Sequence, residues 1–235
     1  MHAGATIGPY REFTTDLVVV PRDDNGLLEA SGEELDSHPG LAAWWHEAER
    51  LWRGGDPNKM TLTQRQDFQQ GLRRQFPIAH HRVLYSASGT HLAACRLEGS
   101  DAVLEHKLYW AATDGIDEAR YLTAILNSSV LARAVEPLQS RGDFGPRDFD
   151  LYVFALGFPA YSDTDPVHAE LVSLAAEAEV IAAAVTFADA WGFQRKRRAI
   201  RERLAEHGVA ERIDTAVTTL LLETAPSEAV DALTA

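Results

Sequence analysis

Cysteine and lysine are scarce in this chain of 235 residues. The single cysteine, Cys95, excludes an internal disulfide and a metal site built from several thiolates. The only lysines are Lys59, Lys107 and Lys196, and none follows a glycine, so a phosphate-binding Gly-Lys-Ser/Thr loop is absent. No apolar run approaches the roughly 20 residues of a membrane span, and residues 1–16 do not have the pattern of a secretion signal. We therefore expect a cytoplasmic protein with no membrane partner.

Motifs of catalysis are also missing. No glycine-rich loop follows a predicted strand, as a dinucleotide or S-adenosylmethionine fold of the Rossmann type requires. No asparagine precedes a proline, which excludes the Asn-Pro-Pro-aromatic motif of amino-directed DNA methyltransferases. Cys95 lies inside a predicted strand and is expected to pack as a small apolar residue, and Ser88 lacks the context of a nucleophile elbow. We therefore expect no catalytic site and no cofactor site in this chain.

The charge is acidic overall but unevenly distributed. A net charge of -13 argues against non-specific binding of polyanions, which needs clustered Lys and Arg. Basic residues nevertheless gather at 73–74, 80–82, 141–147 and 195–203. The last run predicts a basic helix that suits either a polyanion or, alternatively, solvent or a partner helix. A local polyanion site therefore remains compatible with the sequence.

The apolar periodicity predicts an α+β protein: a small, mostly antiparallel sheet with flanking helices, followed by a C-terminal helical segment. We divide it into a mixed region 1–116, a helix-loop-strand-helix junction 117–188 and a helical tail 189–235. The predicted strands are 14–20, 82–86, 91–97, 102–110 and 149–156, the middle three forming a meander. The predicted helices are one with a capping box at Ser31 and Glu34, one from Pro39, one from Thr61 with Gln64 as its capping box, and then 118–126, 130–138, 166–188, 191–206 and 210–222.

Two residue groups have a structural and a functional interpretation. Trp44, Trp45 and Trp52 share a predicted helix, where they either pack in a core or stack on bases. His80, His81, His91 and His106 lie on or beside the predicted meander, where strands could bring two or three together around zinc. Their spacing matches no metal motif, so we expect hydrogen-bonded histidines and no metal site.

The segment 141–148, RGDFGPRD, is the strongest candidate for ligand contact. Its glycines let a backbone approach a phosphate closely, while Arg141 and Arg147 can reach the phosphate oxygens. The alternative is a structural loop in which these arginines pair with nearby aspartates. Asn127 and Ser128, before this segment, are interpreted as a helix break and cap.

Several blocks of the chain, in order, resemble a known family. The blocks are 60–65 (MTLTQR), 76–77 (FP), 88–94 (SGTHLAA), 106–110 (HKLYW), 120–128 (RYLTAILNS), 137–142 (PLQSRG) with Phe144, Gly145 and Arg147, and 165–168 (DPVH). They resemble the C-terminal target-recognition region of adenine-specific DNA methyltransferases from restriction-modification and phage-defence systems, over about residues 14 to 215. The Asn-Ser break, the Gly/Arg loop, the proline turn and the long helix are also similar to the recognition-to-spacer junction of type I restriction specificity subunits.

The resemblance implies a DNA-binding specificity module that reads double-stranded DNA while a target adenine is flipped out. The methyl donor S-adenosylmethionine is expected only on a partner catalytic subunit or domain, so this chain is at most an accessory part of the enzyme. The expected phosphate contacts are Arg141, Gly142 and Arg147, and the expected groove-facing residues are His91, Lys107 and Tyr109.

The chain also departs from the family pattern. Leu151 stands where family members tend to have a polar residue, and Gly157-Phe158-Pro159 replaces a Pro-Ile-Pro-like turn. The catalytic domain is missing altogether. The alternative is therefore a non-catalytic assembly protein whose helices bind a partner, or the inactive remnant of a split methylase.

Overall fold

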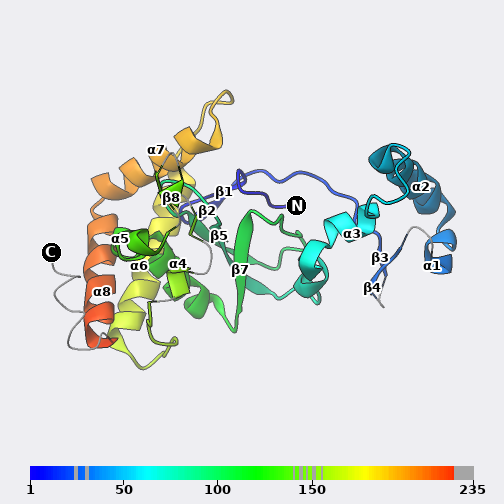
Figure 1. Cartoon of the computed structure of the whole chain (residues 1–235). Coiled ribbons are helices and arrows are strands. Elements are labelled where there is room, and N and C mark those ends of the chain that lie inside the picture. Colours follow the sequence, from blue (N-terminus) through cyan, green and yellow to red (C-terminus); the bar gives the residue numbers. More distant parts are fainter. Residues whose placement is uncertain are drawn as a thin grey trace. The chain divides into compact units, whose positions relative to one another are not determined.

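The computed structural model describes residues 1–23, 26–29, 32–139, 141–142, 145–146, 148–149, 152–154 and 156–224. The chain forms two compact units, which we call unit 1 (Met1 with Asp16–Ile78) and unit 2 (His2–Thr15 with Ala79–Ala235). Both contain helices and short antiparallel strands, so the predicted α+β class is confirmed (Figure 1). The units do not coincide with the predicted segments 1–116, 117–188 and 189–235, because unit 2 takes residues from all three.

Unit 1 has a small apolar core of Leu28, Leu35, Ala42 and Trp45. Its longest helix begins as predicted with Pro39 in the first turn and ends before Gly54, whose φ of 59° suits a glycine. The predicted capping box of Thr61 is also confirmed, whereas Ser31 lies outside the described residues. The elements are β3 (Arg22–Asp23), β4 (Gly26–Leu27), α1 (Glu33–Asp36), α2 (Pro39–Arg53), α3 (Leu62–Gln66) and the 3-10 helices η1 (Phe68–Gln70) and η2 (Arg73–Gln75).

The prediction of a buried strand at 14–20 is wrong. These residues form no strand, and Leu17, Val18 and Val19 are exposed. The segment connects unit 2 to unit 1, and the boundary along the chain lies between Thr15 and Asp16. Strand propensity reflects packing against neighbouring strands, and here the β-branched run pairs with no other described segment.

Unit 2 is built on a three-stranded antiparallel sheet of β5 (His81–Ser86), β6 (Ala94–Glu98) and β7 (Leu108–Thr113). The order is β6-β5-β7, so the predicted meander is wrong: β5, the first strand, lies in the middle and pairs with both others. The third strand also begins later than predicted, because a turn closes with a hydrogen bond from Leu108 N to Glu105 O.

The two faces of this sheet are both buried. Val83 and Tyr85 contribute to the main core beneath the helices, whereas Leu84 and Cys95 pack with Ile7 on the opposite face. This alternation is the period of two that a strand imposes. The N-terminal hairpin of β1 (Ile7–Gly8) and β2 (Arg11–Glu12) supplies Ile7.

Five helices of unit 2 complete the main core, in which α4, α6 and α8 pack side by side (Figure 1). They are α4 (Ile116–Asn127), α5 (Ser129–Val135), α6 (Pro166–Ala184), α7 (Phe193–Glu206) and α8 (Val209–Thr224), with the 3-10 helices η3 (Glu136–Leu138) and η4 (Tyr152–Phe154). The predicted strand at 149–156 is wrong at residues 152–154, which form η4, while residues 150, 151 and 155 lie outside the described part. Arg96 on β6 and Arg120 on α4 both donate to Glu179 on α6, which ties sheet and helices together.

Candidate functional site

A polar cavity of about 870 Å³ lies within unit 2, beside the loop that precedes β6. The loop 88–92 forms one wall, and the helices α4, α5, η3 and α7 contribute others, together with Gln139 and Phe149. Most of its lining side chains carry hydrogen-bonding groups, which suits a polar ligand. The lining residues are Ser88, Gly89, Thr90, His91, Leu92, Asn127, Ser128, Ser129, Ala132, Arg133, Glu136, Gln139, Phe149, Gln194 and Arg201.

Arg201 is the most unusual group in this cavity. Its guanidinium is half-buried, and burial lowers the pKa of Arg201 to about 10. Within the described part of the chain it makes one hydrogen bond, a long one of 3.3 Å from Nη2 to Leu92 O, and it forms no ion pair. A guanidinium offers five N–H donors, so several of them face the cavity or solvent. An anion in the cavity could accept hydrogen bonds from the remaining N–H groups of Arg201.

Two further basic side chains line the same cavity. Arg133 on α5 is exposed and donates from Nη1 to Ser129 Oγ at 3.1 Å. Desolvation, and then the nearby charge of Arg201, lower the pKa of His91 below its ordinary value. A lowered pKa leaves His91 neutral at pH 7, so among the described lining residues two arginine charges stand against the carboxylate of Glu136.

The polar wall at the end of α4 is structural. Asn127 accepts from Ala94 N at 3.0 Å and donates to Ala94 O at 2.9 Å, so it completes the hydrogen bonding at the start of β6. Ser128 caps α5, and its hydroxyl donates to Asp214 of α8 at 2.8 Å. Asp214 also accepts from the backbone N and the hydroxyl of Ser129. The predicted helix break and cap are therefore confirmed.

The predicted phosphate-contacting segment 141–148 adjoins the cavity, but none of its described residues lines it. Arg141 and Gly142 form β8, which pairs with β9 (Gly145–Pro146), and Arg147 lies outside the described residues. After β9, Asp148 forms a bridge with Ser88, and Phe149 N donates to Ala87 O at 2.8 Å. Phe149 and Ser88 both line the cavity, so the segment joins the loop that contains His91.

The other two predicted DNA contacts lie elsewhere. Lys107 is exposed in the turn before β7 and does not line the cavity. Tyr109 is half-buried, stacks on Tyr85 with ring centroids 5.4 Å apart and packs against the main core. The structure therefore brings His91, but neither Lys107 nor Tyr109, to the cavity.

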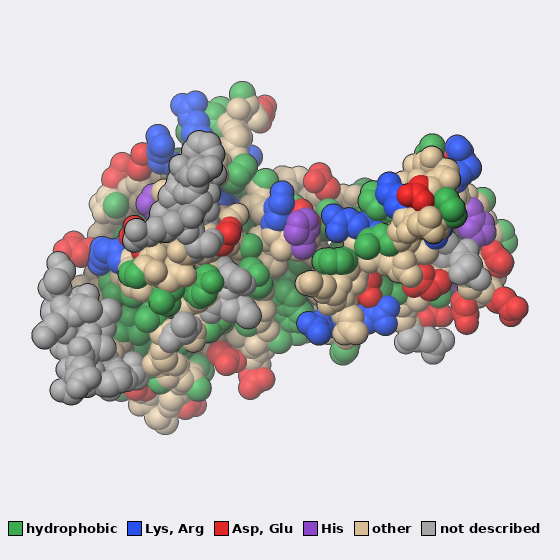
Figure 2. Space-filling view, viewed as in Figure 1, with side chains coloured by type: hydrophobic (Ala, Val, Ile, Leu, Met, Phe, Trp, Pro, Cys, Tyr) green, Lys and Arg blue, Asp and Glu red, His purple; other side chains and the backbone are tan. Residues whose placement is uncertain are grey.

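The basic run 195–203 is largely occupied by contacts within the protein. Arg195 lies over Trp191 at 4.3 Å, and Arg203 pairs with Glu206 at 2.8 Å. Arg197 is buried and donates to two backbone carbonyls. On the face drawn in Figure 2, Lys and Arg side chains lie in separate spots among Asp and Glu side chains. Sequence reasoning missed Arg201 as a distinct group because it treated the run as one surface.

The remaining candidates for chemistry have structural positions. Cys95 is buried and packs as a small apolar residue, as the sequence predicts. This burial raises the pKa of its thiol well above its usual range. Trp45 is fully buried in the core of unit 1, whereas Trp44 is half exposed and Lys59 lies over Trp52 at 3.8 Å.

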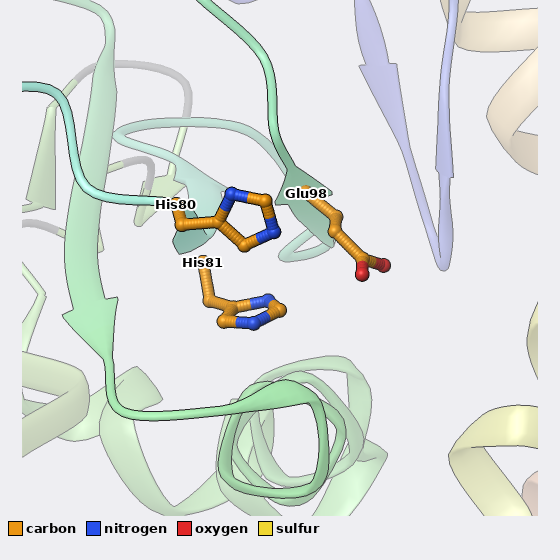
Figure 3. A group of neighbouring side chains, drawn as sticks. All are labelled: His80, His81 and Glu98. Atoms are coloured by element: carbon orange, nitrogen blue, oxygen red, sulfur yellow. The ribbon is translucent and has the colours of Figure 1, made fainter.

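The histidines divide into two groups. His80 and His81 lie close to Glu98, with their candidate ligand atoms all within 4.8 Å of one another (Figure 3). His91 lines the cavity, and His106 is exposed beside Glu105. The sequence showed no metal motif here because Glu98 comes from a different strand.

None of the helices in the described ranges is long and apolar enough to cross a membrane. The cavity and the histidine group are two places in the described part of unit 2 where polar side chains converge. No family model, no curated protein and no solved structure matches this chain.

Proposed function

We propose that this chain is the DNA target-recognition module of an adenine-specific DNA methyltransferase system, and that methyl transfer takes place on a separate catalytic subunit or domain. The ordered sequence blocks carry the family resemblance. The observation that supports DNA contact is the half-buried guanidinium of Arg201, which lines a polar cavity without a carboxylate partner in the described part of the chain. Phosphate is the anion that a DNA partner would supply.

The cavity suits a phosphate contact at the edge of a larger interface. Arg201 offers donors from α7, Arg133 offers donors from α5, and Ser88 and Thr90 offer hydroxyls from the loop. Contacts of this kind fix the register of a duplex, whereas base edges are read elsewhere. In this proposal Arg141, Gly142 and Arg147 contact further phosphates, while His91, Lys107 and Tyr109 remain predicted groove contacts.

This chain would contribute binding and positioning only. The enzyme partner would carry S-adenosylmethionine and the catalytic residues, and the module would hold the duplex while the target base is extruded. An acidic protein can do this because phosphate binding depends on local charge near the backbone, not on net charge.

A binding assay on the whole chain tests the proposal. Fluorescence anisotropy would follow a labelled pool of random duplexes titrated with the chain, alone and together with a candidate methyltransferase catalytic subunit. We expect binding that weakens with salt, and a loss of at least about tenfold in Arg201→Ala, because hydrogen bonds to charged groups contribute roughly 1.5–3 kcal/mol. Arg203→Ala on the same helix is the matched control, since Arg203 pairs with Glu206 and does not line the cavity.

The result that would overturn the proposal is the absence of salt-sensitive binding both with and without the methyltransferase. An equal loss in Arg201→Ala and Arg203→Ala would reject the cavity as the contact while leaving DNA binding in place. Charge reversal by Arg141→Glu with Arg147→Glu then tests the predicted segment separately.

The alternative of an assembly protein rests on the acidic balance of the chain and on the Ala-rich helix from Val167, which is α6 in the structure. Ala175, Ala178 and Ala182 are fully buried in the main core of unit 2, where small residues let neighbouring helices approach. Internal packing accounts for these three alanines, whereas Ala169, Ala183 and Ala184 of the same helix are exposed.

A further inference from the structure

Two imidazoles and a carboxylate converge where strands β5 and β6 meet. His81 is the first residue of β5 and lies directly opposite Glu98, the last residue of β6. Directly opposed residues of an antiparallel pair have side chains on the same face, about 5 Å apart. His80 precedes the strand, and its ring lies 4.6 Å from the ring of His81 at 88° (Figure 3). One candidate ligand atom from each residue lies within 4.8 Å of the other two.

The backbone holds His80 in this position. Gly99 N donates to His80 O at 2.8 Å, directly after the last residue of β6. Gly99 has a φ of 59°, and a Cβ there would lie 3.3 Å from Cε1 of His80. A side chain at this position would therefore be strained and would crowd the imidazole. The end of the hairpin thus keeps His80 beside Glu98.

The ligand atoms have capacity left for an ion. Nδ1 of His81 is buried and has no hydrogen-bond partner among the described residues, which is a costly state for a polar atom. Glu98 accepts from Arg96 Nη1 at 2.8 Å through Oε2, and a carboxylate has a second oxygen. Arg96 itself is bound mainly to Glu179, through Nε and Nη2.

We propose that His80, His81 and Glu98 bind a Zn²⁺ ion, with the fourth coordination position left to water. Two imidazole nitrogens and one carboxylate oxygen are a ligand set that zinc takes in tetrahedral sites. Mg²⁺ and Ca²⁺ prefer all-oxygen sets, so the two histidines discriminate against them. The ion would link the segment before β5 to the end of the edge strand β6. It does not depend on the proposed DNA-binding function.

Metal titration of the whole chain tests this site. After removal of bound metal with a chelator, isothermal titration with Zn²⁺ would measure stoichiometry and affinity, and the visible absorption of added Co²⁺ would report tetrahedral coordination. We expect one equivalent bound by the unaltered chain. His80→Ala and Glu98→Gln should each weaken binding by more than about tenfold, because loss of even an outer partner of a metal site typically costs 10- to 100-fold.

The matched control is His106→Ala, which removes an exposed histidine that lies outside the group. It should leave both the stoichiometry and the Co²⁺ spectrum unchanged. Both single variants alter exposed side chains, so circular dichroism should confirm that they fold. No bound equivalent in the unaltered chain, or equal binding in His80→Ala, Glu98→Gln and the unaltered chain, would overturn the proposal.

Discussion

Arg197 and Arg201 lie one turn apart on helix α7, but they differ in their hydrogen bonding within the protein. Arg197 is 3% exposed and donates to Ile7 O at 2.9 Å and to Gly4 O at 2.6 Å. Arg201 is half-buried, but it makes a single hydrogen bond of 3.3 Å within the described residues. Burial lowers the pKa of both to about 10, and both remain protonated at pH 7. Burying the charged guanidinium is therefore unfavourable for both residues. Two short hydrogen bonds within the protein offset this free-energy cost for Arg197, whereas Arg201 has one long hydrogen bond.

The difference separates a structural cation from one that is available to a ligand. Arg197 ties α7 to the N-terminal hairpin, since Ile7 belongs to β1 and packs beneath the sheet. Arg201 lines the same cavity as His91 and Arg133. Identical residue types on the same side of one helix can thus serve the fold or the ligand site, depending on which acceptors the neighbouring elements offer.

The largest expected effect is on stability, from truncation of the structural arginine. Arg197→Ala should lower the free energy of unfolding by about 3 kcal/mol, because it leaves two carbonyls without donors and removes buried side-chain volume. Arg201→Ala should change it by less than about 1 kcal/mol, since one long hydrogen bond is lost and a desolvation cost is relieved. Urea unfolding followed by circular dichroism measures both. Equal losses in the two variants would break the comparison.

A smaller effect is expected at Asp214, the acid that shares a second cavity with Arg201. Its carboxylate is engaged by Ser128 and Ser129, so Asp214→Asn should loosen the junction of α4 and α5 and cost about 1 kcal/mol in urea unfolding. If Asp214 is not the counter-ion of Arg201, duplex binding should persist in this variant or tighten slightly. A loss of duplex binding as large as that of Arg201→Ala would show that the two side chains act as one unit.

Periodicity does not distinguish these two arginines. Arg197, Ile200 and Leu204 recur at helical spacing and are the buried residues of α7, and Arg201, four residues after Arg197, falls on the same stripe. Arg201 follows the buried Ile200 and reaches a cavity whose other walls are α4, α5 and the loop 88–92. Its exposure depends on tertiary packing, which single-element patterns do not contain.

The same limit applies to the sheet and to the histidine group. The helix starts at Pro39, Thr61 and Pro166 were predictable because capping chemistry is local. The strand order β6-β5-β7 was not predictable, because it depends on which strand forms hydrogen bonds with both of the others. The pairing of His81 with Glu98 follows from that order, so no sequence spacing signalled it. Arg141 and Gly142 were placed on a loop, and the structure gives them a short hairpin with Gly145–Pro146.

The smallest expected effect is a pH dependence that reports on Arg201 through His91. In the free protein, desolvation and then the charge of Arg201 lower the pKa of His91, so protonation is disfavoured. A phosphate bound to Arg201 would offset that charge and favour the protonated imidazole, which raises the pKa in the complex. By linkage, the bound state then takes up protons, and duplex binding should tighten as the pH falls from about 7.5 to about 5.5.

His91→Gln should remove this tightening while retaining salt-sensitive binding at pH 7.5, and Lys107→Gln, outside the cavity, should retain the pH dependence. Anisotropy titrations at a fixed salt concentration across this range measure all three proteins. Binding that weakens at low pH, or that tightens equally without the imidazole, would show that His91 does not sense the occupant of the cavity.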